Sequence, residues 1–201
     1  MQPLILASTS RYRAELLARL RLPFTSVAPG VDETRRPDED AEHLVRRLAE
    51  AKARAVADHA REALVIGSDQ VALLGAPDGG EILGKPGTVE RARAQLAALA
   101  GQRVTFLTGL CLLDAPSGTA QVAVDRTVVR FRALSSAEIY DYVERERPLD
   151  CAGSFKSEGL GIALFEAIET ADPNALIGLP LIELCRMLRA AGVPVLGGPP
   201  D

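Results

Sequence analysis

The alternation of short aliphatic runs with segments of helical periodicity is the feature that most constrains the fold of this chain. Aliphatic runs predict strands at residues 4–7, 64–66, 104–113, 122–132 and 161–168. Apolar residues at helical spacing predict helices at residues 11–20, 41–58, 88–100, 135–147 and 180–191. Because the two patterns alternate without a fixed repeat, we expect an α/β fold with one central, mixed sheet flanked by helices.

Capping and turn residues place the ends of these elements. Thr88 can cap one helix, Ser135 and Glu138 have the spacing of a capping box, and Pro180 suits the first turn of the last helix. Residues 25–40 contain two prolines and several charges, which predicts a long loop. The apolar run 64–66 is followed by Gly67, so we expect Asp69 at a break between strand segments.

The length of 201 residues suits one domain, residues 1–201, with the alternative of two lobes that share a core. No composition shift marks a domain boundary, and residues 197–201 are expected to be a frayed tail. No apolar run is long enough for a signal peptide or for the ~20 residues of a membrane span. The predicted compartment is therefore the cytoplasm, and no membrane partner is expected.

Charge and cysteine content narrow the classes of ligand. The formal net charge is -4, so a long nucleic acid would meet no generally basic surface, although a small anion could bind a local cluster. The three cysteines are widely spaced and form no C-x-x-C pair, which favours reduced thiols in the core. We expect a small-molecule ligand and no nucleic acid.

Residues 8–13 are a candidate phosphate site. Ser8, Thr9 and Ser10 precede the first predicted helix, and Arg11 and Arg13 lie in its first turn. The unpaired amides and the dipole of a helix N-terminus favour an anion there. The alternative is that Ser10 only caps the helix and that both arginines are solvated.

Lysine is scarce, since only Lys52, Lys85 and Lys156 are lysines among the 23 basic residues. A position that keeps lysine in an arginine-rich chain can require a compact ammonium group, for example to bind a phosphate oxygen. The alternative is a solvent-facing helix lysine at Lys52 and a loop lysine at Lys85.

Glu33 and Asp69 are candidate metal ligands, because both are predicted in loops where a carboxylate can face a ligand. Such hard oxygen ligands suit magnesium or manganese. Taken singly, an acid in such a position is more often just a turn or surface residue, and the two gain weight only from the ensemble of candidate residues. His43 and His59 are the only histidines, which argues against a Ser-His-Asp system or a histidine-rich zinc site. The chain also lacks P-loop and Rossmann glycine motifs.

Together these segments resemble one known family. In chain order, the segments are Leu6-Ala7-Ser8-Thr9-Ser10 with Arg13, Val31-Asp32-Glu33, Lys52, Gly67-Ser68-Asp69-Gln70, Gly84-Lys85-Pro86, Thr108-Gly109, the run from Cys151 to Gly159, and Ile177-Gly178-Leu179-Pro180-Leu181. In order and spacing they resemble the Maf family of nucleoside triphosphate pyrophosphatases over almost the whole chain.

The resemblance implies a fold, an activity and residue roles. It implies a fold similar to inosine triphosphate pyrophosphatases, often dimeric, with a nucleotide in a cleft between two lobes and a divalent cation. It implies that Asp69 activates water or holds the metal and that Glu33 assists. It further implies that Arg13, Lys52 and Lys85 bind phosphates and that Ser8 donates to a phosphate oxygen.

Within the family, three features resemble the branch that acts on 7-methyl-GTP: Tyr12, Gln70 and the segment from Ser154 to Gly159. A carboxylate at Glu158 can accept hydrogen bonds from guanine, and an aromatic ring at position 12 can stack on a cationic methylated base. The chain departs from that branch in having tyrosine rather than tryptophan at position 12 and a longer turn at residues 75–80.

Two alternatives remain at this point. The chain could prefer dTTP, UTP or another modified nucleotide, or it could be a nucleotide-binding regulator of cell division without turnover. Asp69, Lys52 and Lys85 are all present, which favours an active hydrolase over the regulator.

Overall fold

The computed structural model describes residues 2–75 and 80–197. It has five α-helices, three short 3-10 helices and seven strands in these ranges. In chain order they are β1 (Leu4–Leu6), α1 (Arg11–Ala18), β2 (Thr25–Ser26), α2 (Ala41–Ala57), β3 (Leu64–Leu74), β4 (Glu81–Leu83), α3 (Val89–Leu99), β5 (Arg103–Asp114), β6 (Thr119–Phe131), α4 (Ser136–Glu146), η1 (Ala152–Ser154), η2 (Leu160–Leu164), β7 (Phe165–Glu169), η3 (Ala175–Ile177) and α5 (Leu181–Ala190).

The strands form one mixed sheet in the order β2-β1-β3-β5-β6-β7, with β4 paired to β3. β1 pairs in parallel with β2 and with β3, whereas β3 with β4 and β6 with β7 are antiparallel pairs. The predicted α/β class with a central mixed sheet is therefore confirmed.

The chain divides into two compact units. Unit 1 comprises residues 1–70, 108–125 and 172–201, and unit 2 comprises residues 71–107 and 126–171. Strands β3, β5 and β6 contribute residues to both units.

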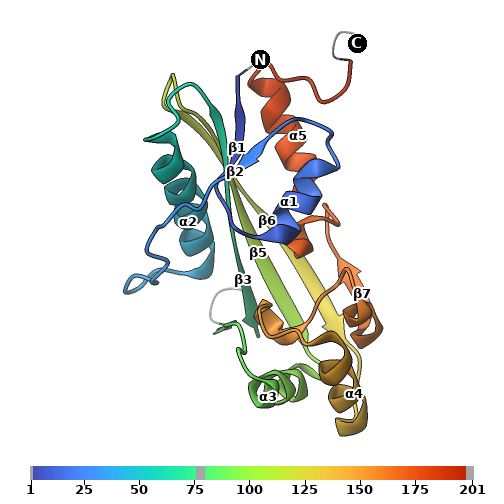
Figure 1. Cartoon of the computed structure of the whole chain (residues 1–201). Coiled ribbons are helices and arrows are strands. Elements are labelled where there is room, and N and C mark those ends of the chain that lie inside the picture. Colours follow the sequence, from blue (N-terminus) through green and yellow to red (C-terminus); the bar gives the residue numbers. More distant parts are fainter. Residues whose placement is uncertain (1, 76–79, 198–201) are drawn as a thin grey trace. The chain divides into compact units, whose positions relative to one another are not determined.

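Both faces of the sheet in unit 1 are covered by helices, with α1 and α5 on one side and α2 on the other (Figure 1). Successive strand residues point to opposite faces, so Leu64 and Ile66 join the α1 and α5 core while Val65 joins the α2 core. This double burial explains why the strands are continuous aliphatic runs rather than alternating patterns.

Two glycines let α2 lie directly on the sheet. A Cβ atom at Gly67 of β3 would come within 2.0 Å of the Ala49 carbonyl oxygen, and one at Gly109 of β5 within 2.3 Å of the Val45 carbonyl oxygen. The predicted strand break at Asp69 is wrong, because β3 continues through Asp69 to Leu74. Gly67 serves close helix packing rather than a turn, and the unbroken strand holds Asp69 under α2.

Unit 2 is organised around an aromatic cluster. Phe106, Phe131, Phe155 and Phe165 meet edge to face, with ring centroids 4.8–5.6 Å apart. The strand predicted at residues 161–168 is only partly present, since residues 160–164 form η2 and β7 begins at Phe165. A Cβ at Gly161 would come within 2.3 Å of the Lys156 carbonyl oxygen, so this segment turns tightly before the strand starts.

Most helix ends lie where the sequence placed them. Ser10, Thr88 and Ser135 are the N-caps of α1, α3 and α4, and Ser135 forms the predicted capping box with Glu138. No helix among the described residues combines the length and apolar character of a membrane span. The predicted frayed tail falls largely on residues 198–201, and the longer turn on residues 76–79, which lie outside the described ranges.

Candidate active site

Lys52 is the centre of a charged cluster in unit 1. It lies on the face of α2 that packs against β3, and its Nζ is 2.6 Å from Asp69 Oδ1 and 2.6 Å from Glu33 Oε1. The Lys52 side chain is 7% exposed and that of Glu33 is 62% exposed. The ammonium thus bridges an almost buried carboxylate on β3 and a solvent-facing one on the loop before α2.

This burial excludes the solvent-facing reading of Lys52. A buried ammonium is costly unless charged partners compensate for lost hydration, and here two carboxylates do so. The three groups will be called the Lys52 cluster. Because one carboxylate faces solvent, a ligand can reach the cluster from the loop side.

Ser8 and the start of α1 lie at the edge of the sheet formed by the carboxyl end of β1, where its parallel pairing with β3 stops. Leu6 is in register with Ile66, so Ser8 and Ser68 each follow that pair by two residues. Ser8 is buried, and its Oγ accepts a hydrogen bond from the Ser10 amide at 3.1 Å. That bond leaves the hydroxyl proton for another acceptor. Ligands of open α/β sheets bind at this edge of parallel strands.

Arg13 joins α1 to the loop before α5. Its Nε donates to the Gly178 carbonyl oxygen at 2.9 Å, which leaves the two terminal nitrogens of the guanidinium for other partners. Burial lowers the pKa of Arg13, while the charges of Asp69 and Glu33 act in the opposite direction. Arg13 therefore lies within the electrostatic reach of the Lys52 cluster.

Gln70 is tied to the protein more closely than the sequence suggested. Its Nε2 donates to Thr108 Oγ1, to the Ala175 carbonyl oxygen and to the Leu176 carbonyl oxygen, at 2.9, 2.9 and 3.1 Å. These acceptors use the donor capacity of the amide. Only Oε1 of Gln70 is left to contact a base.

Tyr12 is half-buried on α1 and has one partner that sequence reasoning missed. Arg11 Nη2 donates to the Tyr12 hydroxyl at 3.0 Å, and the Arg11 guanidinium carbon lies 4.8 Å from the centre of the ring. The ring already makes a cation–π contact, which is the kind of interaction expected with a methylated base.

Lys85 and Glu158 belong to unit 2 and are both exposed. Lys85 lies between β4 and α3, and Glu158 between η1 and η2, where the Ser157 hydroxyl donates to it at 3.5 Å. The segment that carries Glu158 is fastened to α4, because Lys156 Nζ donates to the Glu146 carbonyl oxygen and Leu160 N to the Glu146 carboxylate.

The carboxylates of Asp69 and Glu33 fit a divalent cation in part. Within residues 2–75 and 80–197, no three histidine, cysteine or acidic side chains gather into a metal site. Magnesium, however, is commonly held by one or two carboxylates together with phosphate oxygens and water. Two carboxylates that share one ammonium match that donor set when a phosphate supplies further oxygens.

The Lys52 cluster, Arg13 and Ser8 are groups that can bind phosphate. Comparison with known proteins shows to which family the chain belongs. The family model described as Maf-like protein matches residues 3–191 of this chain. The chain belongs to the Maf family. The predicted Maf resemblance is thereby confirmed over nearly the whole chain.

Several relatives of this Maf chain carry the same name, 7-methyl-GTP pyrophosphatase. A protein of that name from Nitrosococcus oceani is 57% identical over 96% of this chain and 95% of its own length. One from Pseudomonas fluorescens is 55% identical over 97% and 100%, and one from Burkholderia pseudomallei is 58% identical over 98% and 91%.

Among solved structures, the chain is similar to the Ham1 protein of Staphylococcus aureus. The likeness has a TM-score of 0.50 and 14% sequence identity, and it covers 94% of this chain and 100% of that one. It supports the α/β fold and nothing further.

Sequence reasoning missed the residues that hold the site in place. Ser68 donates to the Gly178 carbonyl oxygen at 2.9 Å, Thr108 donates to the Ala175 carbonyl oxygen at 3.0 Å, and Arg47 binds the loop that carries Glu33. Ser68 and Thr108 lie within segments that carry the Maf resemblance, and this position could have identified them as site residues. Arg47 is one arginine among many, and no pattern in the sequence distinguishes it.

Proposed function

We propose that this Maf protein hydrolyses 7-methyl-GTP to 7-methyl-GMP and pyrophosphate by attack of water at the α-phosphate. The observation that carries the proposal is the buried Lys52 between Asp69 and Glu33, beside the point where the parallel pairing of β1 with β3 stops. The names of the full-length relatives supply the substrate.

Attack at the α-phosphorus builds negative charge on the phosphate oxygens and on the departing pyrophosphate. Arg13 presents two terminal nitrogens to such oxygens, and Ser8 offers a hydroxyl proton. Lys52 contributes a positive charge that is largely shielded from water, and we assign it a contact with a phosphate oxygen. Lys85 is assigned the same role on the family resemblance.

Asp69 and Glu33 are the groups that orient water or hold a cation. A bound magnesium or manganese ion would lower the negative charge of the phosphates and polarise the α-phosphoryl oxygen. Asp69 is fixed on a strand and has little freedom, whereas Glu33 is on a loop. We therefore assign Asp69 the role of positioning the nucleophile or the cation, with Glu33 assisting.

Base selection is assigned to Tyr12, Glu158 and Gln70. A carboxylate at Glu158 complements the donors on guanine, and Tyr12 can stack on the cationic base. Gln70 contributes through Oε1 or by holding the η3 loop. The homodimer and the cytoplasmic location stay predictions, which sedimentation and cell fractionation would check.

The direct test is pyrophosphate release from 7-methyl-GTP, GTP, dTTP, UTP, CTP and ATP with magnesium or manganese. We expect 7-methyl-GTP to be preferred and Asp69→Asn to abolish release while the variant remains folded. Glu158→Gln should lower the use of both guanine nucleotides.

Other outcomes of this panel would replace the proposal. Preference for dTTP or UTP would contradict the roles of Tyr12 and Glu158. Nucleotide binding without pyrophosphate release from any substrate would favour a regulator over an enzyme.

A further inference from the structure

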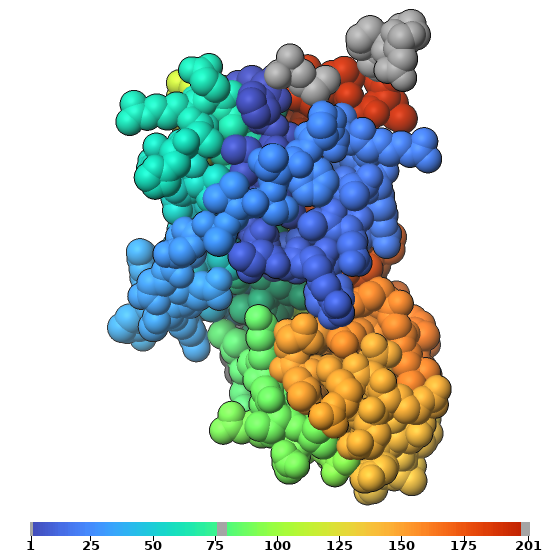
Figure 2. All heavy atoms as spheres, viewed as in Figure 1, coloured from blue at the N-terminus to red at the C-terminus, as the bar shows by residue number. Residues whose placement is uncertain are grey.

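Glu33 needs support from outside its own loop. It lies on the surface segment between β2 and α2, residues 27–40, most of which is exposed and without regular structure (Figure 2). Holding one conformation of such a segment costs conformational entropy for each residue fixed. The 2.6 Å contact from Glu33 to Lys52 therefore calls for other contacts that hold the loop.

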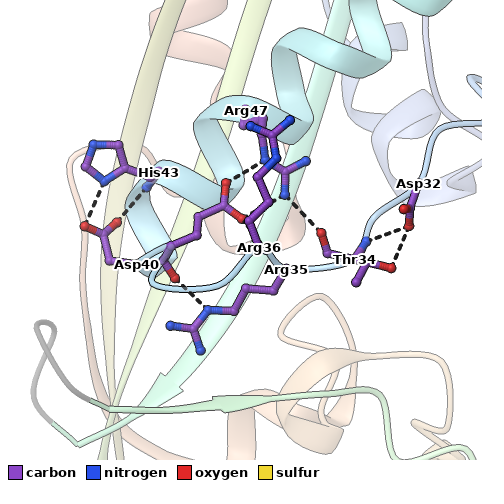
Figure 3. Close-up of polar contacts among 8 residues, drawn as sticks. Asp32, Thr34, Arg35, Arg36, Asp40, His43 and Arg47 are labelled. Carbon is purple, nitrogen blue, oxygen red and sulfur yellow. Dashed lines mark hydrogen bonds and ion pairs between the residues drawn. The ribbon is translucent and has the colours of Figure 1, made fainter.

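Arg47 of α2 supplies such contacts to residues that follow Glu33 in the loop, and Figure 3 shows the one to Thr34. Its Nε and Nη2 bind the two carboxylate oxygens of Glu39 at 2.6 and 2.8 Å. The same Nη2 donates to the carbonyl oxygen of Thr34 at 3.1 Å. One guanidinium thus joins the helix to both the residue after Glu33 and the far end of the loop.

Further hydrogen bonds within the loop involve Thr34 and Glu39, the two residues that Arg47 contacts. Asp32 Oδ1 accepts from the Thr34 amide at 2.9 Å and from the Thr34 hydroxyl at 2.6 Å, which closes a turn around Glu33. Glu39 also accepts from the Arg36 amide at 3.1 Å. The loop is a closed network anchored to α2 through Arg47 (Figure 3).

The Arg47–Glu39 pair differs from an ordinary surface ion pair. The side chain of Arg47 is 20% exposed and that of Glu39 is 8% exposed, and the contact is bidentate. The hydrogen bond from Arg47 lowers the pKa of Glu39 to about 2, so the pair stays charged at neutral pH. The neighbouring pair Arg46–Glu42 is longer, at 3.3 Å, and its side chains are 44% and 59% exposed.

We propose that Arg47 and Glu39 are positioning residues that hold the Glu33 carboxylate against Lys52 for the hydrolytic reaction. The proposal rests on the proposed function, because it concerns the same site. Within the part of the chain that the structure describes, neither residue forms a hydrogen bond or ion pair with Lys52 or Asp69; they act through the loop that carries Glu33. Loss of this anchor lets Glu33 leave the cluster while Lys52 keeps Asp69.

The test compares Arg47→Met with Arg46→Met in two backgrounds, wild type and Glu33→Gln. Displacing a group in an active site by about 1 Å can cost up to ~100-fold in rate, so we expect Arg47→Met to lower kcat about tenfold. In the Glu33→Gln background the same change should cost less than about twofold, because the group that Arg47 positions is already altered. Arg46→Met should leave kcat unchanged in both backgrounds.

Equal losses from Arg47→Met in both backgrounds would overturn the proposal, since Arg47 would then not act through Glu33. No loss of kcat in folded Arg47→Met would overturn it as well. If Arg47→Met does not fold, Glu39→Gln takes its place in the same comparison. Arg47→Lys should recover part of the rate, because lysine keeps the charge on Glu39 but not the forked contact.

Hydrogen exchange tests the anchoring of the loop by Arg47 and Glu39 independently of the proposed function. Amides at residues 32–36 should exchange faster in Arg47→Met and Glu39→Gln than in wild type and Arg46→Met. This result is expected whether or not the chain turns over 7-methyl-GTP. Unchanged exchange would contradict the anchor, whereas an inactive wild type with the expected exchange pattern would contradict only the proposed function.

Discussion

Lys52 illustrates how a single charged residue can organise a polar site inside an aliphatic core. Moving an ammonium out of water costs several kcal/mol, and this cost is offset only by close, well-formed partners. Asp69 and Glu33, each 2.6 Å away, are such partners. With Arg13 in electrostatic reach, two positive and two negative groups balance before any phosphate arrives. The positive groups are consequently in place in advance, which is the arrangement that favours charge stabilisation in a transition state.

Tyr12 provides a prediction at the scale of one residue. Tryptophan presents a larger ring to a cation than tyrosine does, with a difference of about 1 kcal/mol at a partly buried site. We expect Tyr12→Trp to raise kcat/KM for 7-methyl-GTP relative to GTP by about fivefold. Steady-state kinetics with both nucleotides checks this. An unchanged ratio would show that the ring does not stack on the methylated base.

The scarcity of lysine makes Lys52 and Lys85 candidate site residues. The structure buries Lys52 in an ion-pair cluster and leaves Lys85 exposed, and the roles of both in the reaction stay predictions. Arg47 could not be chosen, because its partners Thr34 and Glu39 are brought to it only by the path of the loop. The donor bonds of Gln70 were equally hidden, since they depend on where the η3 loop lies.

At the scale of elements, the approach of α2 to β3 is the feature on which the Lys52 cluster depends. A methyl group at Gly67 would overlap the Ala49 carbonyl, so Gly67→Ala must push the helix away from the strand. Such overpacking costs about 3 kcal/mol. We expect Gly67→Ala to lose that much stability in urea unfolding and to lose activity with it.

Gly84→Ala is the matched control for this change. No atom of the described residues lies within 4 Å of a Cβ at Gly84, and the φ of Gly84 is not positive, so the stability of Gly84→Ala should stay within about 0.5 kcal/mol of wild type. Equal stability of the Gly67 and Gly84 variants would show that α2 is not in close contact with β3.

The capping box of α4 predicts a pH dependence. Hydrogen bonds from the Ser135 amide and hydroxyl, with that from Arg132, lower the pKa of Glu138 from 4.5 to about 2. Because the folded-state pKa is depressed, this contribution is complete above pH 4.5 and is lost as the pH falls toward 2. Glu138→Gln should therefore have a lower Tm than wild type at pH 7, and the difference should shrink by pH 3.

Circular dichroism melts between pH 7 and pH 3 check this prediction. Glu15→Gln, at an exposed glutamate of α1, serves as the control for removing one negative charge. A Tm difference between Glu138→Gln and wild type that does not change with pH would mean that the charge of Glu138 does not support the cap.

Element prediction from sequence was accurate where periodicity and caps agreed, and it failed at glycines. α2, α3 and α4 begin at or next to the predicted positions because their caps are local features. The sequence pattern predicts a strand break after Gly67 and a strand residue at Gly161, and the structure shows neither. Gly67 is needed for contact with α2, which is distant in sequence, and Gly161 for a tight turn against Lys156. Aliphatic periodicity reports neither backbone contact.

At the scale of the whole molecule, the fold should not need the divalent cation that we propose for the reaction. Asp69 is already paired with Lys52, so no group of the cluster depends on a metal for compensation. We expect EDTA to abolish pyrophosphate release. The Tm with EDTA should stay within about 1 °C of the Tm without it, because a ligand raises Tm only to the extent that it is bound, and Asp69 is already paired without a metal. A large fall in Tm on chelation would mean that the cation is part of the folded structure.

The central claim is that water attacks the α-phosphate of 7-methyl-GTP at a site built on Lys52, Asp69 and Glu33. The most direct measurement is hydrolysis in water enriched in oxygen-18, followed by mass spectrometry of both products. The account predicts the label in 7-methyl-GMP and none in pyrophosphate, with no product from Asp69→Asn. Label in pyrophosphate, or full activity in Asp69→Asn, would contradict it.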